Sequence, residues 1–128
     1  LKMFKKPFEF TGRIHRKEYI LSVILVIALY VAFYYVFYFL DEYSEEFYSA
    51  YAVMGFILLW IPSSWFFLAQ STKRCHDRGN SGWYLLIPLY VFVLLVGDSD
   101  YGINKYGLNP KELGNFQEMN SIGKEMQN

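Results

Sequence analysis

Histidine and aspartate stand side by side at His76 and Asp77, next to Cys75, the only cysteine of the chain. An imidazole beside a carboxylate is a common general-base pair, and Cys, His and Asp can all bind metals. Adjacent residues point in different directions on a helix, however, so the doublet alone does not predict a catalytic dyad. The two histidines, His15 and His76, lie far apart in the sequence, so together with one cysteine they give no metal-ligand spacing. A single cysteine also permits no internal disulfide. We therefore expect no metal site, no cofactor and no catalytic residue, and interpret His76 and Asp77 as braces of a turn.

Two long uncharged runs, residues 19–40 and 47–70, dominate the chain around these polar residues. A bilayer core of about 30 Å is crossed by roughly twenty helical residues, so each run predicts a transmembrane helix. The first run holds fourteen Leu, Ile, Val or Phe residues, which together favour membrane insertion by about 6 kcal/mol. A chain of 128 residues is too short to cover two such helices in soluble layers. The sequence therefore predicts a multi-span membrane protein.

A third apolar run, Trp83–Gly97, is shorter, and its fifteen residues make about 22 Å of helix. Pro88 lies about one turn inside the start of this run, where its ring disrupts a helix less than it would at the centre. The run predicts a short third span over about residues 83–99, and a re-entrant or interfacial segment is the alternative.

Taken together, these runs predict an all-α fold, an integral membrane bundle of three transmembrane helices, with residues 1–110 as a single membrane domain. The segment before the first span is expected to be interfacial and amphipathic, because Arg13, Arg16 and Lys17 share one helical face. Residues 111–128 are rich in Asn, Gln, Glu, Lys and Gly, and this composition predicts a disordered, flexible tail.

The distribution of basic residues orients the chain. Residues 1–18 carry six Lys or Arg, the connection 41–46 carries none, and the connection 71–81 carries three. Since positively charged loops stay inside, the N-terminus is expected to be cytoplasmic and the C-terminus periplasmic or extracellular. The first apolar run is too long for the core of a cleavable signal peptide and ends in acidic residues, so we expect it to stay as an anchor.

Three polar segments flank the spans, at residues 8–19, 73–83 and 102–110. They resemble the motifs of the domain-of-unknown-function 805 family of small bacterial inner-membrane proteins, and the likeness covers nearly the whole chain up to about residue 111. The matching residues are Gly12, Arg13, Arg16, Glu18, Tyr19, Arg74, His76, Asp77, Gly79, Ser81, Gly82, Trp83, Gly102, Asn104, Tyr106, Gly107 and Pro110. The resemblance implies a helical membrane bundle with no established activity, and it carries over no catalytic role.

Opposite charges in the first two segments are expected to meet at the cytoplasmic face. Ion pairs gain more at the headgroup boundary than in water, because the dielectric constant there is lower. The predicted pairs are Glu18 with Arg74, and Asp77 with Arg13 or Arg16. The alternative is that each Arg binds a lipid phosphate and each carboxylate faces water.

Tyrosines recur every four residues in the first span, at Tyr30, Tyr34 and Tyr38. A hydroxyl at the depth of Tyr30 or Tyr34 needs a partner, and Ser63, Ser64 or a carbonyl freed by Pro62 can provide one. A small-residue pair at Ala28 and Ala32 suits close helix approach, within the bundle or in a homo-oligomer.

Three functions are compatible with this pattern. The first is a non-enzymatic membrane interaction module whose basic cytoplasmic rim binds anionic lipid headgroups or a membrane-protein partner. The second is an oligomeric transporter or channel subunit lined by Tyr, Ser and Gln70, although ionisable groups are absent from both long runs. The third is a membrane-edge enzyme that uses His76 and Asp77. Nucleic-acid binding is not expected, because the basic residues flank the spans and form no separate domain.

Overall fold

The computed structural model describes residues 3–41, 48–116, 120 and 123–124. Its elements are α1 (Arg16–Asp41), α2 (Tyr48–Asp77), the short 3-10 helix η1 (Gly82–Leu86) and α3 (Tyr90–Val96). In these described residues the one β feature is an isolated bridge between Asn104 and Gly107. The all-helical fold class is therefore confirmed.

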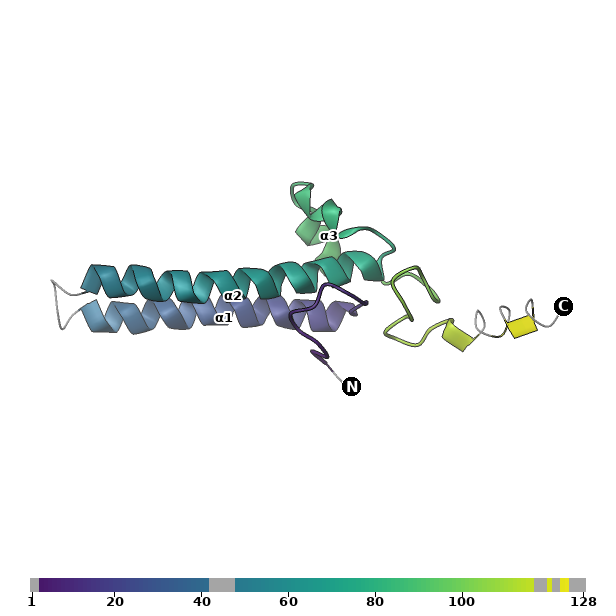
Figure 1. Ribbon diagram of the computed structural model, residues 1–128, viewed down its shortest axis with the longest axis horizontal. Coiled ribbons are helices and arrows are strands. Elements are labelled where there is room, and N and C mark those ends of the chain that lie inside the picture. The colour runs from purple at the N-terminus through teal and green to yellow at the C-terminus, as the bar shows by residue number, and fades with distance from the viewer. Residues whose placement is uncertain (1–2, 42–47, 117–119, 121–122, 125–128) are drawn as a thin grey trace.

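The two long helices α1 and α2 run side by side as an antiparallel hairpin (Figure 1). They contain 26 and 30 residues, which corresponds to about 39 and 45 Å of helix. Only 6% and 17% of their most apolar windows are buried inside the chain. The core helix of a soluble domain would be mostly buried, whereas these helices present their Leu, Ile, Val and Phe side chains outward. Both are long and apolar enough to cross a membrane.

One predicted polar contact inside the hairpin is confirmed. The hydroxyl groups of Tyr30 and Ser63 lie 2.8 Å apart. The Ser63 hydroxyl also donates to the carbonyl oxygen of Leu59 at 2.7 Å, next to Pro62 in the middle of α2. In contrast, Tyr34 and Tyr38 are exposed and stack on each other with their ring centroids 6.2 Å apart.

The helix α2 continues seven residues beyond the apolar run and ends at Asp77, so His76 and Asp77 lie on its last turn. Gly79 stops the helix because it adopts a left-handed backbone conformation with φ of 71°. The amide of Asn80 donates to the carbonyl of Cys75, and the amide of Gly79 to that of His76, both at 3.0 Å. This is the bonding pattern of a Schellman motif, which satisfies the last carbonyls of the helix.

A continuous third transmembrane helix over residues 83–99 is not formed. Leu89, directly after Pro88, has a positive φ of 64°, and this break separates η1 from α3. The helix α3 has seven residues, about 10 Å in length. It lies beside the end of α2 that also carries the N-terminal segment (Figure 1). The shorter, re-entrant or interfacial alternative describes this run better, because a proline inside a fifteen-residue run leaves no stretch long enough to span.

The C-terminal side, which is expected to lie beyond a third span, folds back onto the end of the hairpin that carries the N-terminal segment. The amide of Asp100 donates to the carbonyl of Asp77 at 2.9 Å, and Arg13 donates to the carbonyl of Asp100 at 2.8 Å. Residues 98–116 therefore lie at the same end of the hairpin as the N-terminal segment (Figure 1). Between α2 and these residues the structure has only the short helices η1 and α3, and the side of the membrane on which the C-terminus lies stays a prediction.

The segment that is predicted to be flexible, residues 111–128, begins with an ordered turn. Asn109 and Asn115 are both buried and hold each other through two hydrogen bonds, of 2.8 and 3.1 Å. An ordered turn therefore continues to residue 115. Most of the remaining tail, and the acidic connection that was expected to face outward, lie outside the described residues.

Candidate functional site

A buried charge cluster joins the start of α1 to the end of α2. The Nε of Arg13 donates to a carboxylate oxygen of Asp77 at 3.2 Å, and the two side chains are 1% and 0% exposed. Arg74, one helical turn before Asp77, donates to the other carboxylate oxygen. The predicted pair of Asp77 with Arg13 is confirmed. Arg16 takes no part, because it lies on the surface within 4.0 Å of Asp98.

The predicted pair of Glu18 with Arg74 is wrong. A carboxylate oxygen of Glu18 accepts a hydrogen bond from the Phe4 amide at 2.9 Å, and the other lies 3.6 Å from Nδ1 of His15. Arg74 has other partners, because its guanidinium donates to the carbonyl of Leu94 near the end of α3 and to the Asp77 carboxylate.

Both buried guanidinium groups are satisfied largely by backbone carbonyls of the end of α3 and of the segment that follows it. Arg13 donates to the carbonyls of Gly102 at 2.8 Å and Gly107 at 3.2 Å. Arg74 donates to the carbonyl of Leu94 at 3.1 Å and to that of Gly97. Two arginines and one aspartate leave a surplus positive charge, which these carbonyl dipoles solvate. The arginines thereby tie residues 94–107 to the helix ends.

The His76 and Asp77 side chains are held by different partners. The imidazole of His76 stacks on the Tyr106 ring, with centroids 3.8 Å apart and an interplanar angle of 7°. Asn104 donates to the His76 carbonyl at 2.9 Å and accepts from the Tyr106 amide at 3.0 Å, which fixes the stacked ring. Because Arg13 and Arg74 occupy the Asp77 carboxylate, it does not orient His76. The two side chains therefore brace the turn, and they do not form the imidazole–carboxylate hydrogen bond of a general-base dyad.

Two motif glycines allow close backbone approach. A Cβ atom at Gly79 would lie 2.4 Å from a carboxylate oxygen of Asp100. At Gly82 a Cβ atom would lie 2.7 Å from the methyl group of Thr72. The left-handed backbone of Gly79 and the nearby Thr72 methyl group at Gly82 therefore favour glycine at both positions of this turn.

The remaining motif residues are spread over the same end of the hairpin. The Tyr19 and Ser71 hydroxyls lie 3.2 Å apart, and both residues are buried. Ser81 caps η1 by accepting a hydrogen bond from the Trp83 amide, and the Trp83 ring is 74% exposed. Gly12 has a positive φ of 94° just before Arg13. Pro110 is exposed and lines the cavity described next.

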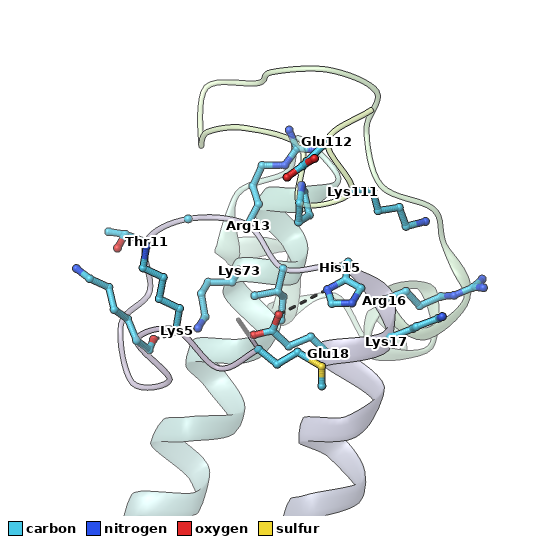
Figure 2. Close-up of a pocket in the computed structure, with 15 residues that line it drawn as sticks. Lys5, Thr11, Arg13, His15, Arg16, Lys17, Glu18, Lys73, Lys111 and Glu112 are labelled. Carbon is cyan, nitrogen blue, oxygen red and sulfur yellow. Dashed lines mark hydrogen bonds and ion pairs between the residues drawn. The ribbon is translucent and has the colours of Figure 1, made fainter. Parts of the chain in front are cut away.

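An open cavity of about 950 Å³ lies over this end of the hairpin (Figure 2). Its walls come from the N-terminal segment, the start of α1, the end of α2 and the turn after residue 109. Two carboxylates, Glu18 and Glu112, and seven basic side chains line it. The basic residues are Lys5, Lys6, Arg13, Arg16, Lys17, Lys73 and Lys111.

Several of these cations already have partners. The Lys6 ammonium donates to the Glu9 carboxylate at 3.0 Å, and this hydrogen bond lowers the pKa of Glu9. The buried Lys73 donates to the carbonyl of Lys6 at 3.2 Å. In contrast, no described carboxylate lies within ion-pair distance of Lys5, Lys17 or Lys111. The cavity therefore has unneutralised positive charge, which is the electrostatic requirement of an anion site.

The N-terminal segment is fixed to α2 by polar side chains that sequence reasoning did not assign to it. We call residues 3–10 the strap. Lys73, Gln70 and Trp65 donate to the carbonyls of three consecutive strap residues, 6, 7 and 8, at 3.2, 2.8 and 3.2 Å. Phe4 and Phe8 pack on Phe66 of α2 at centroid distances of 6.2 and 5.9 Å. The available signal was an isolated amide, Gln70, at the end of an apolar run, where a side chain needs a partner.

Other residues that form the cavity were also missed. His15, Lys73, Lys111 and Glu112 line it, and none is among the residues that match the family's motifs. Metal binding has no support here, since the described residues contain no group of three or more His, Cys, Asp or Glu.

Comparison with known proteins gives one result. The model of the family described as "Protein of unknown function (DUF805)" matches residues 7–108. Neither a curated protein nor a solved structure matches the chain. The matched range contains the buried charge cluster, both long helices and the turn that stacks on His76.

Proposed function

We propose that this chain, which belongs to the DUF805 family of proteins of unknown function, is a bacterial inner-membrane protein that binds anionic lipid headgroups in its basic cavity. The observation that carries this proposal is the surplus of cations in the cavity, and above all Lys5, Lys17 and Lys111, which lack a described carboxylate partner. The role is non-enzymatic: the protein binds lipid and presents a fixed surface at the membrane.

The position of the cavity supports a lipid ligand. It opens at the ends of two helices whose apolar faces are exposed along their length, so a bilayer around those helices would end near the cavity. Each basic residue near an anionic membrane surface contributes about 1 kcal/mol of attraction. Trp83, whose ring is largely exposed at this same end, suits the headgroup region as well.

The orientation follows from charge. Residues 1–18 hold six Lys or Arg, and positively charged flanks stay in the cytoplasm. Because residues 98–116 fold onto this same end through Arg13, we propose that both the N-terminal and the C-terminal sides face the cytoplasm. The module is then a two-span hairpin with a third, interfacial segment.

The alternative functions have weaker support. Gln70, one of the residues expected to line a channel, is buried and donates to the Pro7 carbonyl. His76 stacks on Tyr106, and its neighbour Asp77 is engaged by two arginines. These contacts favour structural roles for the residues on which the transporter and enzyme alternatives depend.

A test compares two matched double variants of the full chain. Lys17→Gln with Lys111→Gln removes two cations from the cavity, while Lys105→Gln with Lys124→Gln removes two exposed cations elsewhere. Binding of phosphatidylglycerol and of phosphatidylcholine is measured by native mass spectrometry in detergent. Two cations at about 1 kcal/mol each predict a loss of about 30-fold for the anionic lipid in the cavity variant. An equal loss in both variants would mean that net charge, and not the cavity, attracts the lipid.

A further inference from the structure

A second, apolar pocket lies below the strap. It has a volume of about 350 Å³, within the range of about 300–1,000 Å³ that small-molecule sites occupy. Its walls come from Phe4, Pro7 and Phe8 of the strap and from facing aliphatic and aromatic side chains of α1 and α2. The one hydroxyl in its wall, Ser63, is already bonded to Tyr30 and Leu59. A pocket without an available polar partner suits a hydrocarbon chain and not water or an ion.

The strap separates this apolar pocket from the basic cavity. Strap residues Met3, Lys5 and Lys6 line the cavity, whereas Phe4, Pro7 and Phe8 line the pocket. The two sites therefore share one wall. The strap is also preformed, because three side chains of α2 hold its carbonyls and Glu18 accepts from the Phe4 amide.

On both long helices, the basic cavity lies nearer the polar end of the hairpin and the apolar pocket lies farther from it along the helix axis. On α1 the cavity reaches Glu18 and the pocket begins at Leu25; on α2 the cavity reaches Lys73 and the pocket begins at Phe66. Each step is seven residues, or about 10 Å along the helix axis. The headgroup layer on each side of the hydrocarbon core is about 5 to 8 Å thick, so this step takes a ligand from headgroup depth into the hydrocarbon.

We infer that a single phospholipid with an anionic, phosphate-bearing headgroup occupies both sites. Its phosphate lies among the lysines that surround Glu18 and His15 in Figure 2, and one acyl chain lies in the apolar pocket under the strap. The inference rests on the proposed function for its headgroup half. It adds that the ligand is one bound molecule, recognised at its chain as well as at its charge.

The experiment fills the apolar pocket. Leu59→Trp places a large side chain in the pocket, and Leu58→Trp, at the adjacent exposed position outside the pocket, is the matched control. Leu29→Trp in the pocket and Ile27→Trp outside it form a second pair on α1. Two probes are titrated against the detergent-solubilised full chain: dioctanoyl phosphatidylglycerol, and glycerol phosphate, which has the phosphate without the chains.

The expected result is that both pocket variants lose at least tenfold in affinity for the acylated probe, while both control variants and the wild type bind alike. Affinity for glycerol phosphate stays unchanged in the pocket variants and falls when Lys17 and Lys111 are both changed to Gln. Pocket variants that bind the acylated probe like their controls would overturn the inference and leave the proposed function standing. Wild-type binding of glycerol phosphate as tight as that of the lipid would overturn it too, because the ligand would then be a free phosphate. Loss of neither probe in the lysine variant would refute the proposed function itself.

Discussion

Arg13 and Asp77 form a buried ion pair of 3.2 Å across a separation of 64 residues, and this pair joins the beginning of α1 to the end of α2. The same Asp77 also accepts from Arg74, so one carboxylate serves two guanidinium groups. Arg13 also donates to the carbonyl of Gly102, and Arg74 to those of Leu94 in α3 and of Gly97 directly after it. The cluster therefore holds residues 94–107 against the ends of the two long helices, and Arg13 also lines the basic cavity.

Asp77→Asn is expected to lower the free energy of unfolding by about 3 kcal/mol, because removing one partner of a buried ion pair leaves uncompensated charge. Arg13 and Arg74 would both lose their counter-charge. Thermal unfolding of the purified protein in detergent measures the change. Glu9→Gln is the control, because the Lys6–Glu9 pair lies on the surface and its loss should leave stability almost unaltered. A melting temperature of Asp77→Asn equal to that of the control would contradict the structural role of the cluster.

Substitutions of Glu18 and of Arg74 should change the free energy of unfolding independently, because each side chain binds other partners. A double-mutant cycle of Glu18→Gln and Arg74→Gln is expected to give additive changes in unfolding free energy, within about 0.5 kcal/mol. The cycle of Asp77→Asn with Arg13→Gln should instead show clear coupling, because these side chains touch. Strong coupling in the first cycle would mean that the two residues meet in the membrane after all.

The C-terminal side is expected to face the cytoplasm. Asn120→Cys, on the C-terminal side, and Thr11→Cys, on the N-terminal side, both place a thiol at an exposed position, whereas Cys75 is buried. A membrane-impermeant maleimide applied to intact cells should label neither position before the membrane is opened, and both afterwards. Labelling of Asn120→Cys alone in intact cells would indicate that residues 83–97 cross the membrane.

His76→Gln is expected to fold and to bind anionic lipid like the wild type. The change removes the stacking on Tyr106, which contributes about 1 kcal/mol to stability. Tyr106→Leu removes the same stacking from the other side and should cause a similar loss of stability. Thermal unfolding and lipid binding are measured on both variants. If His76→Gln alone abolished the protein's cellular phenotype while it remained folded, acid–base chemistry at the imidazole would rank above the binding function.

The two long helices and some of the side-chain contacts between them could be predicted from the sequence alone. An apolar run of twenty or more residues can be recognised as a potential membrane span from its length and hydropathy alone. Contacts with the rest of the protein are not needed for this prediction. Ser63 could be named as one of three candidate partners of Tyr30, because a hydroxyl at that depth has few available partners. The partner of Asp77 could be narrowed to Arg13 or Arg16, because opposite charges at one membrane level attract, and the structure has Arg13.

Other features depended on tertiary structure. Arg74 binds Asp77 and backbone carbonyls and does not bind Glu18. Because every residue has a backbone carbonyl, the sequence does not show which carbonyls an arginine side chain will reach. The same reason applies to the strap, whose carbonyls bind Lys73, Gln70 and Trp65. The third apolar run was ambiguous because its length lies between that of a spanning helix and that of an interfacial one. In the structure this run is divided at Pro88 into two short helices. Arg74 of α2 binds the carbonyls of Leu94 and Gly97, near the end of the run, and this contact keeps it beside α2.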